Sequence, residues 1–245
     1  MSHNVYVDDT LVFGAEAKTK TNVLGEVNPE KLFKEYNFTE LVMNSTNDYT
    51  RELDTDSTIA VGSGGCLFTT LATDTRVANL GLGAVRWYPS QSPVVEMKFK
   101  IDVITNVAIY AGFNDAATEA STYLPHGITD ATQTATATDS AGFLFDTLQT
   151  LDYWNIVNSL AAGAAKAFTQ LASTYVPVAA THQTIRVAID TSGNAWYYYN
   201  GVQVGYKATA VTSTTPLVPF FGIRNNAGAA HVATLRVVRV WGNAV

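Results

Sequence analysis

The sequence predicts an all-β fold, a sandwich or a barrel of short antiparallel strands. From about residue 50 onward, apolar and polar residues alternate with the two-residue period of a strand that is buried on one face. Gly, Asn, Asp or Ser separates most of these segments, at a spacing of roughly 8–12 residues that is typical of sandwiches and barrels. The length of 245 residues suits one large β domain, or one domain with an appended arm.

The first 49 residues differ in composition from the rest, which predicts an N-terminal arm followed by a domain over residues 50–245. Within the arm, VYVDDTLVFG alternates enough to pair as a strand. NPEKLFKEY predicts a short helix, because Asn28 is a suitable N-cap, Pro29 is favourable at the first helical position and Glu30 complements the helix dipole.

The clearest strand of the domain is VVEMKFKIDV, in which Val95, Met97 and Phe99 share one face. NVAIYAGFND predicts a second long strand directly after it. The series continues through AGFLFDT, LDYWNIV, IRVAID, AWYYYNG, VQVGYKA, VPFFGIRN and ATLRVVRVW. In the last of these, the Val237–Val238 pair interrupts the alternation, which predicts a bulge or burial on both faces.

Two segments fit more than one structure. NSLAAGAAKAFTQL is rich in Ala, which favours a helix, but Gly163 at its centre and the strand patterns on both sides favour strand–loop–strand. YLPHGITDATQTATATDS has no apolar face, so it predicts a long exposed loop or an edge strand.

The composition excludes several kinds of partner. The net charge is −6 and no basic run occurs, so the chain lacks the cationic surface that nucleic acid requires. No apolar stretch approaches the roughly 20 residues of a membrane-spanning helix. The N-terminal MSHNVYVDDT lacks the basic start and apolar core of a secretory signal. We therefore expect no nucleic-acid or membrane partner, and synthesis and folding in a cytoplasm.

The run IRVAIDTSGNAWYYYNGVQVG predicts a hairpin, because Asn200-Gly201 supplies the positive φ angles of a tight turn. Its alternation places Trp196 and Tyr198 on one face and Tyr197 and Tyr199 on the other. This arrangement favours sheet packing over a ligand-stacking surface. The run is similar to a hairpin of concanavalin A-like (laminin-G-like) jelly-roll domains. Together with VVEMKFKIDVITNVAIYAGFND, AGFLFDT, PLVPFFGIRNNAG and ATLRVVRVW, it resembles the decoration (cement) proteins on the heads of tailed bacteriophages, over roughly residues 50–245.

The resemblance implies a concanavalin A-like jelly-roll β-sandwich with an N-terminal arm, and a non-enzymatic virion structural protein. Such a protein binds the outer surface of a phage head as a homotrimer, with the major capsid protein as its partner, and stabilises the head through many weak contacts made together. The apolar residues of the arm are the expected capsid or subunit contacts: Val5, Tyr6, Val7, Leu11, Phe13, Leu32 and Phe33.

The alternative is a lectin-like carbohydrate-binding module of a phage tail fibre or another surface structure. Three aromatic residues at predicted loop edges would then stack on the glycan: Trp87, Tyr88 and Tyr123. Exposed loop aromatics are equally suited to a subunit contact.

The sequence predicts no catalytic residue, metal ligand or cofactor. Glucanases of this fold use Glu-x-Asp-x-x-Glu on a central strand, whereas Glu52, Asp54 and Asp56 depart from that spacing and precede the predicted sandwich strands. Asp115 and Asp190 are not followed by the ligand-dense loop that hard cations need. The four histidines are widely separated, and the single cysteine is expected to be a small buried thiol.

Overall fold

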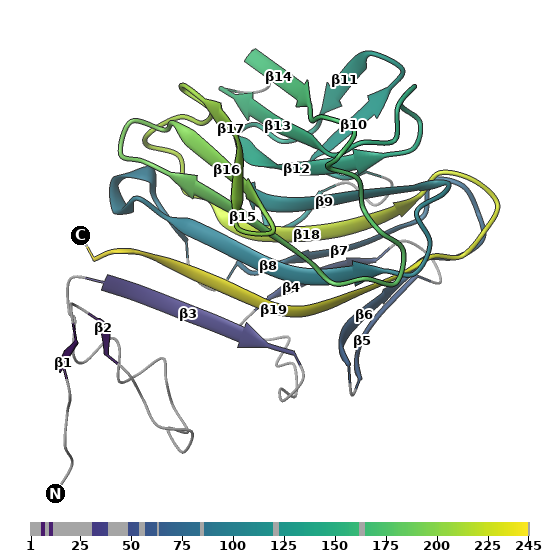
Figure 1. The fold of residues 1–245 in the computed structure, drawn as a ribbon, viewed down its shortest axis with the longest axis horizontal. Helices are drawn as coiled ribbons and strands as arrows, with labels where there is room; N and C mark the ends of the chain where they lie inside the picture. The colour runs from purple at the N-terminus through teal and green to yellow at the C-terminus, as the bar shows by residue number, and fades with distance from the viewer. Residues whose placement is uncertain are drawn as a thin grey trace, which may run out of the picture.

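The computed structural model shows two stacked antiparallel sheets (Figure 1). It describes residues 6–7, 10–11, 31–38, 49–53, 57–62, 64–83, 86–119, 123–161 and 165–244. Over these residues the predicted all-β sandwich is confirmed, with one short 3-10 helix, η1 (Pro89–Gln91).

The first sheet has seven strands. In spatial order they are β14 (Ala165–Gln170), β13 (Asn155–Leu160), β12 (Ser140–Asp146), β9 (Val107–Asn114), β18 (Val218–Asn225), β7 (Val77–Gly81) and β4 (Thr50–Leu53). The expected strand–loop–strand around Gly163 is present as β13 and β14, although residues 162–164 lie outside the described part of the chain.

The second sheet has eight strands. Seven follow one another in space: β17 (Val202–Lys207), β16 (Ala195–Tyr199), β15 (Gln183–Ile189), β8 (Val94–Ile101), β19 (Val232–Asn243), β6 (Gly65–Thr69) and β5 (Thr58–Gly62). The eighth, β3 (Lys31–Asn37), runs beside the second half of β19 (Figure 1). Two hairpins are separate from these sheets: β1 (Tyr6–Val7) with β2 (Thr10–Leu11), and β10 (His126–Thr129) with β11 (Thr132–Ala135).

The prediction of a short helix in NPEKLFKEY is wrong over the described residues, because Lys31–Asn37 forms the strand β3. β3 pairs with β19 along seven residue positions, from Lys31 opposite Asn243 to Asn37 opposite Val237. A free edge of a sheet offers a full row of backbone hydrogen bonds, which outweighs the weak local preference for a helix. The strand also buries Tyr36 among the core residues of the sandwich.

Aromatic side chains from both sheets fill the core between them. Phe99 of β8 lies 5.1 Å from Phe221 of β18, measured between ring centroids, and Phe143 of β12 lies 5.8 Å from Tyr197 of β16. Trp154 is fully buried, and its indole nitrogen donates a hydrogen bond to the Gln183 side chain at 3.2 Å. A large aromatic residue can be buried this way because its single polar group has a partner.

A hairpin covers the far side of the seven-stranded sheet. Where the sequence predicts an exposed loop or an edge strand, β10 and β11 form a hairpin that packs on the sheet. Leu124 and Ile128 are buried there against Tyr110, Leu144 and Phe220, which point away from the main core. This second cluster explains why β9, β12 and β18 are buried on both faces along almost their whole length.

Candidate functional site

The outer face of the eight-stranded sheet, which none of the other described elements covers, is the candidate site. In β8, β15 and β16 buried residues alternate strictly with partly exposed ones. Directly opposed residues of neighbouring strands point to the same face, so the register of the sheet determines which outward side chains adjoin. The strands β3, β19, β8, β15, β16 and β17 together form this face.

One line of opposed residues across these six strands is apolar, and we call it the apolar row. Its members are Phe33, Trp241, Val94, Ala188, Trp196 and Tyr206. Since neighbouring strands lie about 4.8 Å apart, the row is roughly 24 Å long. All six residues are partly exposed, and Tyr206 is 50% exposed. The ring centroids of Trp196 and Tyr206 lie 5.0 Å apart.

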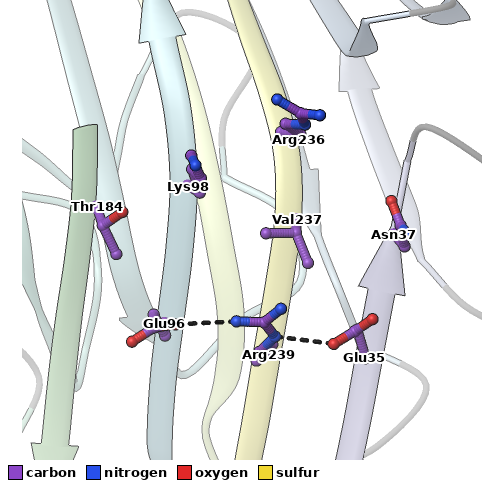
Figure 2. A pocket seen from close by; sticks show the side chains of 8 residues that line it. All are labelled: Glu35, Asn37, Glu96, Lys98, Thr184, Arg236, Val237 and Arg239. Atoms are coloured by element: carbon purple, nitrogen blue, oxygen red, sulfur yellow. Dashed lines mark hydrogen bonds and ion pairs between the residues drawn. The ribbon is translucent and has the colours of Figure 1, made fainter. Parts of the chain in front are cut away.

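The next line of opposed residues is charged and aromatic: Tyr198, Arg186, Glu96, Arg239 and Glu35. The Arg186 guanidinium lies 4.1 Å from the centre of the Tyr198 ring. Arg239 donates from Nε to Glu35 at 2.8 Å and from Nη1 to Glu96 at 3.5 Å (Figure 2). The hydrogen bond to Glu35 is the main reason why the pKa of Arg239 is raised.

A shallow pocket of about 480 Å³ opens next to these rows on β3, β8, β15 and β19. Its lining residues are Glu35, Asn37, Glu96, Lys98, Thr184, Arg236, Val237 and Arg239 (Figure 2). Polar and charged side chains make up all of this lining except Val237. The pocket is therefore suited to a polar group that accompanies an apolar contact on the neighbouring row.

A β-bulge in β19 shapes this pocket. Leu235 is opposite Phe99 and Val237 is opposite Lys98, so Arg236 is the extra residue. The bulge turns Arg236 and Val237 to the same exposed side, although they are consecutive. It lies where β6 ends its pairing with β19 and β3 begins, one residue from the Val237–Val238 pair that predicted it.

The covered face of the other sheet contains a buried polar chain. The Gln133 amide nitrogen lies 2.9 Å from His126 Nδ1, and His126 Nε2 lies 2.6 Å from Ser140 Oγ. Ser140 Oγ lies 3.0 Å from Ser159 Oγ, which donates to the Ala137 carbonyl at 2.9 Å. Because an amide nitrogen only donates, Nδ1 is the acceptor and Nε2 carries the proton. Each group thus donates to the next.

This direction excludes the buried serine as an activated nucleophile. A general base must accept the serine proton, whereas His126 Nε2 donates toward Ser140. Burial, followed by the positive charge of Lys166, lowers the pKa of His126 to about 3. The imidazole is therefore neutral in the folded protein, and the chain fixes the hairpin to the sheet.

A buried ion pair fixes the same hairpin at its other end. Asp146 is fully buried and lies 3.3 Å from Arg224, and it accepts a hydrogen bond from Asn226 at 2.8 Å. The backbone N–H of Ile128, in β10, donates to the same carboxylate at 3.1 Å. All these contacts are internal, so this cluster is structural.

The residues of the arm that were predicted to contact a capsid or another subunit lie in different places. Phe33 belongs to the apolar row, while Leu32 is 38% exposed and lies on the opposite face of β3. Tyr6 and Val7 pair with the strand of Leu11 in the β1–β2 hairpin, and the structure describes only the backbone of these three residues. Val5 and Phe13 lie outside the described residues.

The three aromatic residues proposed for glycan stacking do not share one environment. Trp87 is 2% exposed and belongs to the core, so its ring is not available for stacking. Tyr88 is 44% exposed and precedes η1, and Tyr123 is 50% exposed in the segment before β10.

The carboxylates considered for catalysis or metal binding are also separate. Glu52 lies in β4, which is a strand of the sandwich and not a segment before it, but at the edge of its sheet. Asp54 and Asp56 lie outside the described residues. Asp190 accepts hydrogen bonds from the backbone and side chain of Asn194 in its own turn. Within the described ranges, no three His, Cys, Asp or Glu residues lie together as a metal-binding group.

Local sequence patterns did not reveal the apolar row or the pair Lys98 and Arg236. Alternation does predict which residues of each strand point outward, and it places Trp196 and Tyr198 together as the structure does. All four aromatics of AWYYY were expected to serve sheet packing, but only Tyr197 and Tyr199 lie in the core. Which outward residues adjoin across strands depends on register, and no local pattern specifies that.

Comparisons with known proteins identify the fold. No protein-family model matches the chain, and no curated protein matches it. Among solved structures, it is similar to the carbohydrate recognition domain of Emp46p in its metal-free form, with a TM-score of 0.58, 12% identity, and coverage of 84% of this chain and 94% of that one. It is also similar to a family 16 glycoside hydrolase, an endo-glucanase from Bacteroides ovatus, with a TM-score of 0.60, 8% identity, and coverage of 84% and 99%.

A third similar structure is a protein of unknown function from Shewanella oneidensis MR-1. The TM-score is 0.54 at 13% identity, and the alignment covers 95% of this chain and 96% of that chain. At such low identities these likenesses show the fold alone: a concanavalin A-like jelly-roll β-sandwich. In the part of the chain that the structure describes, no helix is long and apolar enough to cross a membrane.

Proposed function

We propose that this protein is a virion structural protein that decorates the outside of a phage head and docks on the major capsid protein through the apolar row. The observation that supports this proposal is the composition of the open face. Trp, Tyr, Phe and Arg are the residues enriched at the centres of protein–protein interfaces. On this face Phe33 is opposite Trp241, Trp196 is opposite Tyr206, and Arg186 lies in the neighbouring charged line.

The shape of the face agrees with a broad partner. The row crosses six strands of an open sheet, and the pocket beside it is shallow. Burying one such aromatic side chain contributes about 1.5–3 kcal/mol, so a single face gives a modest affinity. In the proposal the protein is a homotrimer on the outer capsid surface, so several copies of the face bind together and the combined affinity is much higher.

Capsid binding tests this function directly. Phage heads that lack the protein are mixed with purified protein and sedimented, and we expect the wild type to pellet with them. Trp241→Ala and Trp196→Ala should each weaken this binding by about tenfold or more, the loss typical of an interface hot spot. Val178→Ala removes a residue that is 54% exposed elsewhere and should bind as the wild type does. Wild-type protein that stays in the supernatant would rule out capsid decoration.

A second candidate function is carbohydrate binding on the same face. Partly exposed Trp196, Tyr198 and Tyr206 offer aromatic surfaces of the kind that line ligand sites, and Emp46p and Emp47p appear among the similar structures with carbohydrate recognition domains. A glycan array separates the two functions. Binding that disappears in Trp196→Ala, by a protein that does not sediment with capsids, would favour the lectin-like module.

A further inference from the structure

The pocket beside the apolar row has an unequal charge balance. Its lining includes three cations and two carboxylates. Arg239 lies between Glu35 and Glu96 and is ion-paired to both, at 2.8 Å and 3.5 Å (Figure 2). One arginine therefore engages both carboxylates of the pocket. Lys98 and Arg236 are the two cations that remain.

Lys98 and Arg236 are neighbours because of the bulge in β19. Val237 is opposite Lys98, and the bulged Arg236 precedes it and also points outward. Figure 2 shows both side chains at the end of the pocket away from Arg239, with Lys98 on β8 and Arg236 on β19. Across the described ranges of the chain, neither side chain has a hydrogen bond or an ion pair to another residue.

More positive charge lies at the same end. Lys100 follows Lys98 on the outward side of β8. The pKa of His182, just before β15, is lowered by burial first, and then by the positive charges of Lys98, Arg236 and Lys100. Three cations thus lie around one histidine, on a chain whose net charge is −6. A group of cationic side chains without an ion-paired carboxylate favours the binding of an anion.

We infer that Lys98 and Arg236 bind carboxylate side chains from an acidic segment of the partner protein that docks on the apolar row. This inference rests on the proposed function, because the partner is the protein that docks on the apolar row. Glu35, Glu96 and Arg239 line the pocket and lie next to that row, so a docked partner is adjacent to Lys98 and Arg236. Arginine holds a carboxylate through two parallel N–H donors, and lysine adds a point charge.

The pocket favours a carboxylate over a phosphate monoester, which is doubly charged near neutral pH. Glu35 and Glu96 lie in the same pocket, and their negative charge opposes a doubly charged ligand more strongly than a singly charged one. The adjoining aromatic row is typical of a protein contact. An acidic polysaccharide also presents carboxylates, so the experiment includes it as a separate ligand.

The test uses the full chain and a hexaglutamate peptide at low salt, with binding measured by calorimetry and by NMR shifts. We expect the wild type to bind the peptide, with the largest shifts near Lys98 and Arg236. The double variant Lys98→Gln/Arg236→Gln should bind about tenfold more weakly. Lys166→Gln/Lys207→Gln changes the net charge equally on other strands and should bind as the wild type does. A wild type that does not bind, or equal losses in both double variants, would overturn the inference.

Two further ligands complete the design. Inorganic phosphate and polygalacturonate are titrated under the same conditions, and we expect each to bind more weakly than the peptide. Tighter binding of either would overturn the assignment to a protein segment. Capsid sedimentation then separates this inference from the proposed function. If the peptide binds but capsids do not, the function is wrong; if capsids bind wild type and the Lys98/Arg236 variant equally, only the inference is wrong.

Discussion

The two sheets of the sandwich share a core but differ in what lies on their outer faces. The seven-stranded sheet is covered by the β10–β11 hairpin, and its central strands are buried on both sides. The eight-stranded sheet is open, and its central strands alternate between buried and partly exposed residues. On the covered side His126 and Asp146 are enclosed by internal hydrogen bonds, whereas on the open side Trp196, Tyr206 and Arg239 remain partly exposed. We therefore expect the first face to contribute mainly to stability, and the proposed binding to use the second.

Phe220→Ala tests the covered face and should have the largest effect. Phe220 is fully buried beneath the hairpin and packs against Tyr110, with ring centroids 6.1 Å apart. Its truncation leaves a cavity, so the free energy of unfolding should fall by about 3–5 kcal/mol. Urea denaturation followed by circular dichroism measures the change.

Trp196→Ala is the matched change on the open face. Because Trp196 is partly exposed, its truncation should lower the free energy of unfolding by only about 1 kcal/mol. Equal losses for Phe220→Ala and Trp196→Ala would show that both faces serve packing, and the contrast between them would disappear.

The buried His126, on the covered face, should make the free energy of unfolding depend on pH. The effect should be smaller than that of Phe220→Ala and larger than that of Trp196→Ala. His126 has a folded-state pKa of about 3, below the ordinary value of 6.5 for a histidine. The unfolded chain therefore binds a proton that the folded chain excludes, so stability is complete above pH 6.5 and is lost progressively as the pH falls toward 3. From pH 7 to pH 4.5 this group alone should cost about 2–3 kcal/mol.

The variant His126→Gln isolates this effect. Gln can still donate toward Ser140 but does not titrate, so the variant should lose less stability than the wild type between pH 7 and pH 4.5. Urea denaturation at both pH values gives the comparison. Parallel losses in the two proteins would mean that His126 is not the acid-sensitive group.

Arg239→Gln tests the open face and should have the smallest effect on stability. The Arg239 side chain is 45% exposed, and both of its glutamate partners are 26% exposed. Ion pairs so exposed contribute about 1 kcal/mol or less and are screened by salt. Thermal denaturation at low and high salt should show a small loss that salt abolishes. A loss of several kcal/mol in the free energy of unfolding would show that this ion pair stabilises the fold, as the contacts of the covered face do.

Local patterns predicted the elements whose partners are close in sequence. The alternation in Val95, Met97 and Phe99 is the alternation observed in β8, and Asn200-Gly201 forms the turn between β16 and β17. The Val237–Val238 irregularity marked a bulge to within one residue. In each case the structure follows from backbone preference and burial over a few residues.

Local patterns failed where distant partners decide the structure. Nothing in NPEKLFKEY shows that β19, some 200 residues later, offers a free edge. The local helix signals therefore led to the prediction of a helix where the structure has a strand. The hairpin over the seven-stranded sheet was missed because His126 and Gln133 look solvent-exposed until their buried hydrogen bonds are known. The apolar row combines Phe33 with Trp241, and only the sheet register brings them together.

The pairing of β3 with β19 has a consequence for the timing of assembly. β3 is synthesised about 200 residues before its partner strand Val232–Asn243. Contacts between such distant segments form late and slowly. A nascent chain therefore lacks the Phe33 end of the apolar row until its partner strand has been made, and attachment to a partner before that point is disfavoured.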